Sequence, residues 1–365
     1  MTETRPLLVL VGGFLGAGKT RLLLTVAERL RTGGARVALI TNDQGGALVD
    51  TKLAEVSALD AEEITGGCFC CRFSDFVSAA ERLRASHPDV ILVEPVGSCI
   101  DISATVLQPL RNLHSDRFQL APYTVLVDPQ RAAELLAPAA DPQLAYLFRN
   151  QLEEADLVCF SKADVNSNFP KLPAGFALKL SAVTGEGVDQ WLREILAGSH
   201  VPGSRLLDVD YARYADAEAA LGWLNWQAEL RLRTPLSPAQ VVGPLLEDLD
   251  RRLSSLGAQI AHLKILDESG SGYIKASVCG NGEEPIVQGA LDASPAQIHR
   301  LLINLRARGA PNLLEQAVNE ATAELEAQRS ILHFECFRPA PPKPERRITK
   351  GQQRASELPD VTLDA

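Results

Sequence analysis

The chain has 365 residues, 46% of them hydrophobic, and a formal net charge of −10 from 46 acidic and 36 basic side chains. This composition excludes a disordered chain, and the excess of acidic residues argues against a broad nucleic-acid-binding surface. No apolar run reaches the roughly 18 residues that span a bilayer, and the first residues lack the pattern of a secretion signal. We therefore expect a cytoplasmic protein of two domains, with no membrane and no nucleic-acid partner.

The first 200 residues alternate short apolar runs with amphipathic segments. Residues 20–34 have the apolar spacing of a helix and stop at Gly33-Gly34. The apolar runs are typical of strands buried on both faces of a parallel sheet; they are residues 6–12, 35–42, 88–95, 123–128, 155–162 and 175–182. The pattern predicts an α/β domain with a doubly wound, mostly parallel sheet over residues 1–200.

The first predicted strand runs into GFLGAGKT, Gly13–Thr20, which fits the pattern G-x-x-x-x-G-K-S/T. Glycines in such a loop let successive backbone N–H groups surround phosphate oxygens, and the N-terminus of the following helix adds its dipole. Lys19 would reach the terminal phosphates, and the Thr20 hydroxyl would ligate Mg²⁺. The residues expected around the phosphates are Gly13, Gly16, Ala17, Gly18, Lys19, Thr20 and Arg21.

Polar residues at the ends of later strands complete a nucleotide site. Glu94 ends the third strand, where it could share Mg²⁺ with Thr20 or act as an ordinary edge carboxylate. In SKAD, Asp164 could accept both edge donors of guanine while the stem of Lys162 covers the ring, or both could be solvated. Adenine lacks this donor pair, so the sequence favours guanine. The expected guanine-binding residues are Ser161, Lys162, Asp164, Ser181 and Ala182.

Three of the seven cysteines fall within ITGGCFCCRF, residues 64–73. Thiolates are soft ligands that suit Zn²⁺ and Cu(I) and also bind Co²⁺. Neighbouring residues of a strand point to opposite faces, so Cys70 and Cys71 could share an ion only if the chain bends, as Gly66 and Gly67 allow. Three ligands leave one position open for exchange, which a closed structural site lacks. The alternatives are small buried residues or a redox pair.

Taken in order, GFLGAGKT, GGCFCC, VEPVG, SKAD and SAVTGEGVDQWL resemble the CobW-like metal-chaperone GTPases, relatives of the GTPases that insert nickel into urease and hydrogenase. The resemblance covers about the first 200 residues. It implies GTP hydrolysis coupled to delivery of Zn²⁺ or Co²⁺ to a client metalloprotein. It also implies Cys68, Cys70 and Cys71 as cargo ligands. A homodimer is a further expected assembly.

The polar run after the second strand, NDQGG, occupies the place of a first switch loop. Asp43 or Gln44 could position the attacking water, or the run could be an ordinary polar turn. It departs from the commoner family run N-E-x-G-E. The cysteines follow on the same connection, so we hypothesise that phosphate contacts order the switch and the switch positions the thiols. The expected catalytic residues are Lys19, Thr20, Asp43 and Glu94.

Cys99 lies five residues beyond Glu94. It could complete the thiolate set or act as a transfer ligand, and the alternative is a packed free cysteine.

The remainder predicts a linker (201–219), a ferredoxin-like α+β domain (220–338) and a flexible, Pro-rich tail (339–365). The second domain has a β-α-β-β-α-β order, with helices expected within residues 294–328. Its work would be client recognition or docking onto the first domain. Trp223 and Trp226 could be interface anchors, or simply pack in the sheet.

Two other functions remain compatible with these motifs. One is a GTP-gated assembly or reactivation chaperone without metal cargo, in which the cysteines stabilise the switch. The other is an ATP-using kinase or ligase, which the guanine signals disfavour.

Overall fold

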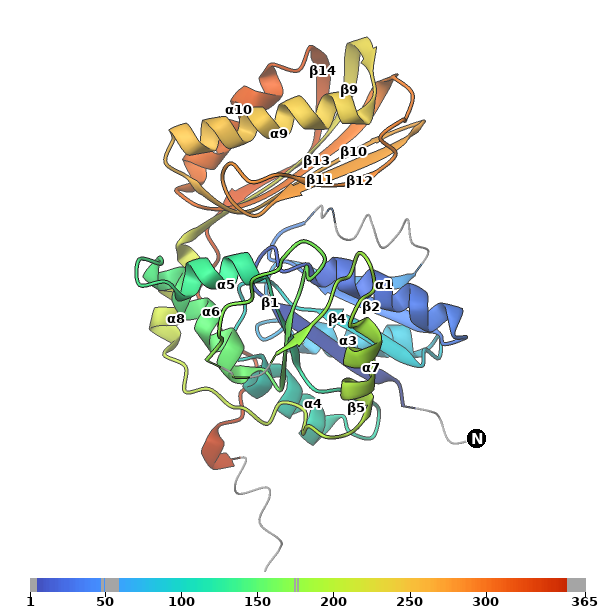
Figure 1. Ribbon diagram of the computed structural model, residues 1–365, viewed down its shortest axis with the longest axis vertical. Helices are drawn as coiled ribbons and strands as arrows, with labels where there is room; N and C mark the ends of the chain where they lie inside the picture. The colour runs from blue at the N-terminus through green and yellow to red at the C-terminus, as the bar shows by residue number, and fades with distance from the viewer. Residues whose placement is uncertain (1–4, 47–48, 50–58, 174, 176, 353–365) are drawn as a thin grey trace, which may run out of the picture.

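The computed structural model describes residues 5–46, 49, 59–173, 175 and 177–352. These residues form two sheet domains, one above the other in Figure 1, followed by a segment that returns to the first domain. Among them, no helix is both long and apolar enough to cross a membrane.

A parallel sheet of eight strands is the centre of the first domain, within the described part of the chain. The strand order is β3-β2-β4-β1-β6-β7-β8, and β5 pairs with the start of β1. The strands are β1 (Leu7–Gly13), β2 (Val37–Asn42), β3 (Asp60–Ile64), β4 (Val90–Glu94), β5 (Gln119–Leu120), β6 (Thr124–Val127), β7 (Leu157–Phe160) and β8 (Leu178–Lys179).

Helices cover both faces of this sheet. In β1, Leu8 and Leu10 pack into one core and Val9 and Val11 into the other, because successive side chains of a strand alternate. The Val9 face is covered by α1 (Lys19–Thr32) and α7 (Val188–Leu196). The Leu8 face is covered by α3 (Phe73–Arg84), η1 (Ser103–Leu107), α4 (Gln108–Leu113), α5 (Pro129–Leu136), α6 (Pro142–Glu154) and α8 (Tyr211–Ala219). The doubly wound sheet predicted from the sequence is confirmed.

The expected linker contributes to the first domain. Its last residues form α8, which begins after an Asp210 side chain that caps the helix by accepting the N–H groups of Ala212 and Arg213. Tyr214 of this helix is fully buried beside α6 and its hydroxyl accepts the N–H of Ile100 at 3.2 Å. Residues 211–219 are therefore packed structure rather than an extended connection.

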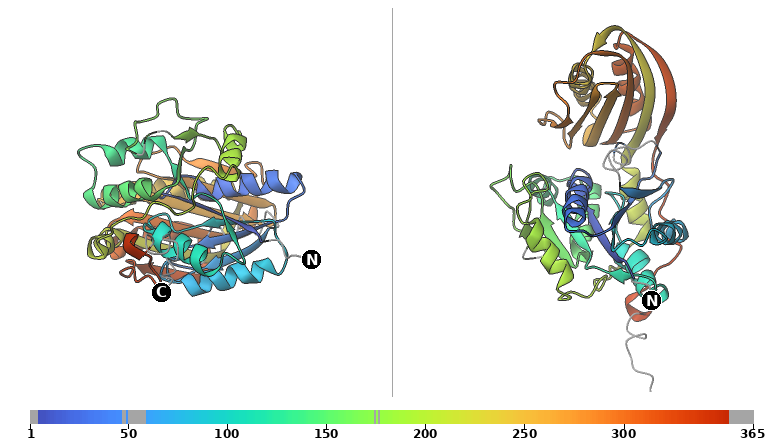
Figure 2. Two further views of the ribbon diagram at one scale, coloured as in Figure 1. Left: turned by 90° about the horizontal axis from the view of Figure 1, so that it is seen from below. Right: turned by 90° about the vertical axis from the view of Figure 1, so that its right-hand side faces the viewer.

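The second domain is an antiparallel sheet with helices on one face (Figure 2). Its elements are β9 (Leu221–Leu236), α9 (Pro238–Ser255), β10 (Gln259–Ser269), β11 (Gly272–Val278), β12 (Ile286–Gly289), β13 (Ala296–Arg308), α10 (Pro311–Ala323) and β14 (Ala327–Phe337). The order β14-β9-β13-β10 is that of a ferredoxin-like fold, and β11 and β12 extend it at the β10 edge. The predicted fold class is confirmed.

One element of the second domain was predicted wrongly. Residues 296–308, placed within a helical stretch by the sequence analysis, form strand β13. The run Leu301–Leu305 is buried on both faces, because the helices cover one side and the first domain covers the other. A strand buried on both sides loses the alternation of polar and apolar residues that identifies an exposed strand.

The two tryptophans divide between the two faces of this sheet. Trp226 lies in the core beneath the helices. Trp223 packs in the core of the first domain and stacks against Phe337, with ring centroids 6.3 Å apart. The guanidinium of Arg306 lies over the Trp223 ring, 4.1 Å from the ring centre. Trp223 is thus an anchor between the domains.

After β14, the chain runs back along the first domain (Figure 1). The Glu345 N–H donates to Cys70 O and the Ile348 N–H to Ala104 O, both at 2.9 Å, and Arg347 pairs with Asp101 at 2.7 Å. We call residues 339–348 the strap. The sequence predicts a flexible tail from residue 339, whereas the strap is fastened by backbone hydrogen bonds and an ion pair that a Pro-rich composition does not reveal. Residues 353–365 lie outside the described chain.

Candidate functional site

The phosphate-loop sequence folds as its glycines require. Gly16 and Gly18 have φ angles of 81° and 87°, and at Gly13 a Cβ would lie 2.3 Å from Leu126 O. The Lys19 ammonium donates to Gly13 O at 3.0 Å, which folds the loop around the lysine. Because α1 begins directly after Gly18, its N-terminal N–H groups face the space that the loop encloses.

This loop borders a pocket that both domains line. Most of the residues predicted to bind nucleotide reach it: Gly16, Ala17, Gly18, Lys19, Thr20, Arg21, Asp43, Glu94, Ser161, Lys162, Asp164 and Ala182. Gly13 and Ser181 do not line it. Gly13 holds Lys19, and the Ser181 hydroxyl accepts the N–H groups of Val183 and Thr184 at 3.1 and 3.0 Å, which shapes the loop after β8.

The phosphate end of the pocket brings together oxygen donors and a cation. Glu94, at the end of β4, lies 3.9 Å from the Lys19 ammonium, and both side chains are buried. Thr20 lines the same wall. A hydroxyl and a carboxylate are hard oxygen donors of the kind that bind Mg²⁺ alongside substrate phosphates, so this donor set fits the ion.

The opposite end is built from the loops after β7 and β8. Lys162 adopts a left-handed φ of 53°, and its ammonium pairs with Asp128 at 2.5 Å. Ala182 O accepts the Thr25 hydroxyl at 2.8 Å, which ties this loop to α1. Lys162 and Asp164 therefore face one cavity with the phosphate loop.

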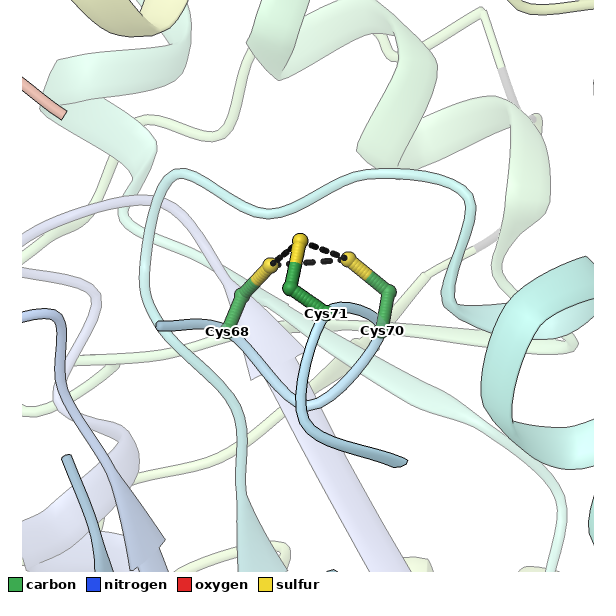
Figure 3. A group of neighbouring side chains, drawn as sticks. All are labelled: Cys68, Cys70 and Cys71. Carbon is green, nitrogen blue, oxygen red and sulfur yellow. Dashed lines mark hydrogen bonds between the residues drawn. The ribbon is translucent and has the colours of Figure 1, made fainter. Parts of the chain in front are cut away.

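The three clustered thiols point toward one another (Figure 3). The chain reverses direction in a turn that begins at Cys68. In this turn the N–H groups of Cys71 and Arg72 both donate to Cys68 O, at 3.0 Å each. The Sγ–Sγ distances are 2.7 Å for Cys68–Cys70, 3.4 Å for Cys68–Cys71 and 3.7 Å for Cys70–Cys71. Sulfurs that share a tetrahedral Zn²⁺ lie about 3.8 Å apart, so two separations already approach that value.

The protonation of these thiols is uneven. Hydrogen bonds from Cys70, Cys71 and Cys99 lower the pKa of Cys68 well below that of a free thiol. The pKa of Cys70 is raised by its hydrogen bond with Cys68, and burial raises it further. The pKa of Cys71 is raised to about 11, chiefly by its hydrogen bond with Cys68. The cluster thus holds one thiolate readily and releases further protons when a cation binds.

Cys99 lies beside the trio and is fully buried. Burial raises its pKa well above that of a free thiol. It contacts Cys68 without belonging to the group whose sulfurs converge within 4.8 Å, so its position resembles that of a supporting residue more than that of a fourth ligand.

A single buried amide joins the two sites. Asn42, the last residue of β2, lines the nucleotide pocket and donates to Ile64 O at 2.9 Å and Gly67 O at 2.8 Å. Its oxygen accepts the N–H of Phe69 at 2.9 Å. The cysteine loop is therefore anchored, on both sides of Cys68, to a residue that lines the pocket beside the phosphate loop.

Asp43 and Gln44, the two residues expected to act in a switch, point in different directions. Asp43 lines the nucleotide pocket and accepts two hydrogen bonds from Arg306 of the second domain, at 2.8 and 2.9 Å. Gln44 borders the cavity beside the cysteines instead and donates to Glu218 at 2.8 Å. Of the two water-positioning candidates, only Asp43 faces the phosphate loop. Residues 47–48 and 50–58 of this connection lie outside the described chain.

The sequence analysis missed the basic residues that the second domain contributes to the nucleotide pocket. Arg306 on β13, His262 and Lys264 on β10 and Lys275 on β11 all line it. A signal was present, since His262 and Lys264 alternate with the buried Leu263 and Ile265. That alternation predicts one polar face, but not what the face covers.

The strap was missed in the same way. The Lys343 N–H donates to the Cys71 sulfur at 3.1 Å, and Pro341 and Pro342 border the cavity next to Cys68. The thiols are thus enclosed by the cysteine loop on one side and by the strap on the other.

Comparison with known proteins gives consistent matches in the first domain. Residues 7–174 match the family described as CobW/HypB/UreG, nucleotide-binding domain. The zinc chaperone YeiR of Escherichia coli K12 is 30% identical over 172 residues, which cover 45% of this chain and 47% of YeiR. The zinc chaperone CobW of Pseudomonas aeruginosa is 30% identical over 185 residues, which cover 42% of this chain and 48% of CobW. The chain spans about half the length of these relatives. The crystal structure of HypB from Helicobacter pylori in complex with nickel aligns with a TM-score of 0.40 at 17% identity, covering 57% of this chain and 92% of HypB.

Proposed function

Because its first domain belongs to the CobW/HypB/UreG nucleotide-binding family, we propose that this chain is a GTP-hydrolysing metallochaperone. It would carry Zn²⁺ or Co²⁺ on Cys68, Cys70 and Cys71 and deliver the ion to a client metalloprotein. The observation that carries the proposal is the amide of Asn42, which borders the nucleotide pocket and holds the cysteine loop. All seven cysteines are free, in keeping with a reducing compartment such as the cytoplasm.

In this account, the hydrolytic residues surround the terminal phosphate. The Lys19 ammonium stabilises charge on the phosphate oxygens, while Thr20 and Glu94 offer oxygen ligands to Mg²⁺, which when bound neutralises charge on the phosphates. Asp43 orients the attacking water. Its ion pair with Arg306 must open first, so we expect slow turnover until the switch is reordered by a client.

Guanine is the base that best fits the far end of the pocket. The Asp164 carboxylate can accept both donors on the guanine edge, whereas adenine presents one donor and one acceptor there. Mispairing at such a site costs about 1–3 kcal/mol, or about 5- to 150-fold in affinity.

The cargo assignment depends on the donor set. Three sulfurs suit a soft or borderline cation, and a trio leaves one tetrahedral position for a client ligand. Relatives named zinc chaperones make Zn²⁺ the first candidate. Co²⁺ remains the second because thiolate sites accept it.

The nucleotide half of the proposal is tested by competition between GTP and ATP and by phosphate release. The wild-type chain should prefer GTP by at least about fivefold, and Asp164→Asn should abolish that preference. Asp292→Asn, an exposed change in the second domain, is the matched control. Equal affinity of the wild type for both nucleotides would remove the guanine assignment.

The metal half is tested by elemental analysis after loading with Zn²⁺. The wild type should hold about one ion per chain, and Cys70→Ser with Cys71→Ser should hold almost none while hydrolysing GTP at the wild-type rate. Cys336→Ser, in the second domain, controls for the loss of a thiol. If the double variant kept its metal, the ion would be bound elsewhere and the cysteine cluster would be ruled out as the cargo site.

A further inference from the structure

The second domain lies directly against the phosphate loop. Its strand β11 ends beside Gly16, where an added Cβ would come within 2.3 Å of the Cys279 sulfur. Arg131 of α5 donates to Ala261 O of β10 at 3.3 Å, and Arg306 pairs with Asp43. These contacts place one face of the second sheet over the mouth of the nucleotide pocket.

That face carries lysines at neighbouring positions of two strands. Side chains alternate along a strand, so His262 and Lys264 of β10 share the face opposite to the buried Leu263. On β11, Lys275 shares it as well, because it pairs in register with Leu266, two residues beyond Lys264. All three basic residues line the nucleotide pocket together with Lys19.

The two domains thus focus positive charge on one enclosed space. Lys275 is 9% exposed and Lys19 6%, so neither charge is fully screened by water. Burial, and then the charges of Lys264, Lys19, Lys275 and Lys162, hold the pKa of His262 well below its usual value. Ammonium groups from both domains act on the same point, and an anion placed there would be attracted by all of them.

We propose that Lys264 and Lys275 bind the phosphate groups of the nucleotide from the second domain, opposite Lys19 and the phosphate loop. This inference rests on the proposed GTPase function and adds a second wall to its site. A triphosphate reaches further toward the second sheet and carries more negative charge than a diphosphate, so the lysines favour GTP over GDP. Nucleotide state is thereby sensed by the second domain as well as by the switch.

The test measures nucleotide affinity in the full-length chain with Lys264→Gln and Lys275→Gln together. Affinity for a non-hydrolysable GTP analogue should fall about 10- to 100-fold, affinity for GDP should fall less, and affinity for GMP should stay the same. Lys264→Arg with Lys275→Arg should restore most of the loss. Arg231→Gln with Arg300→Gln removes two exposed charges from the same sheet and should change little.

Failure of the inference and failure of the proposed function give different results. If Lys264→Gln with Lys275→Gln binds the GTP analogue as tightly as the Arg231→Gln, Arg300→Gln control does, the lysines do not contact phosphate. If the wild type binds no guanine nucleotide, the proposed function fails, and inorganic triphosphate then tests the lysines alone.

A second measurement uses the wild type alone, so that the inference stays testable even if the glutamine variant does not fold. In the wild type, saturating GTP analogue should protect Lys264 and Lys275 from acetylation, read by mass spectrometry, while the exposed Lys171 keeps its reactivity. Unchanged acetylation of both lysines overturns the inference.

Discussion

The nucleotide pocket and the thiol site each have one wall from a sequence motif and one wall from the C-terminal half of the chain, but the second walls differ in kind. Over the nucleotide pocket, the second wall is a sheet whose side chains are fixed by strand pairing. Over the thiols, it is the strap, whose contact with Cys71 is a backbone N–H. A sheet retains its geometry while ligands exchange, whereas a strap held by a few bonds can open. Under the proposed function, we expect the first wall to sense the nucleotide and the second to control release of the metal.

The largest effect, a loss of stability, is expected from removing the side chain of Arg306, which joins the second sheet to Asp43. Its side chain is 5% exposed and donates to Asp43, to Leu224 O and to Asn225 Oδ1. Arg306→Ala leaves a partly buried carboxylate without its cation and should lower the free energy of unfolding by about 3–5 kcal/mol. Urea titration checks this. Arg300→Ala, exposed on the same strand, should stay within about 0.5 kcal/mol of the wild type, and equal stability of the two variants would contradict the account.

The affinity of the thiol site for metal should depend strongly on pH. Cys70 and Cys71 have raised pKa values, about 11 for Cys71, so both are protonated near neutrality and must lose a proton to bind metal. Apparent affinity should therefore rise with pH by up to about 100-fold per unit, for two protons released, and level off only above those pKa values. Competition with a chromophoric chelator between about pH 6.5 and 8 measures the slope. A flat profile would show that these thiols are not the ligands.

Removing the Asn42 amide, which links the two sites, should have an intermediate effect on metal affinity. Asn42→Ala deletes three hydrogen bonds, each with a net value of about 1 kcal/mol, from the cysteine loop. Metal affinity should fall about 10- to 100-fold, with a smaller change in GTP affinity. Asn150→Ala, which loses one bond to Tyr146 O on α6, is the control. If metal affinity stayed at the control value, the loop would be held by something other than Asn42.

The smallest effect is expected at the strap. Glu345 accepts the Ser74 N–H at 2.9 Å and the Ser74 hydroxyl at 2.6 Å, at an exposed position. Glu345→Ala should loosen the strap by about 1 kcal/mol and speed transfer of bound Zn²⁺ to a chelator about fivefold, with little change in affinity. Glu284→Ala, exposed in the second domain, should leave the rate unchanged. An unaltered rate in Glu345→Ala would mean that the strap does not limit release.

Local patterns were enough to predict the first domain and its motifs. The glycines at 13, 16 and 18 specify a phosphate loop through backbone conformations that other residues rarely adopt, so sequence and structure agree there. The sequence allowed the three thiols to converge only if the chain bends, and the turn closed on Cys68 O supplies that bend. The order of elements predicts the ferredoxin-like domain, whereas the apolar run of β13 does not distinguish a buried strand from a helix.

The second walls could not be predicted, because they depend on how distant parts of the chain pack. Lys264, Lys275 and Arg306 belong to strands far along the sequence from the phosphate loop, and nothing local marks which face of the sheet will meet it. The same holds for the strap, where Lys343 contributes only its backbone N–H, a group that every residue but proline has.

Metal affinity as a function of nucleotide state tests the central claim most directly. Zn²⁺ affinity of the full-length chain would be measured by chelator competition with a non-hydrolysable GTP analogue and Mg²⁺, with GDP and Mg²⁺, and without nucleotide. Through Asn42 and the two-walled pocket, the account predicts that the analogue changes affinity at least about tenfold relative to GDP. Identical affinity in all three conditions would contradict the coupling of the nucleotide pocket to the thiols.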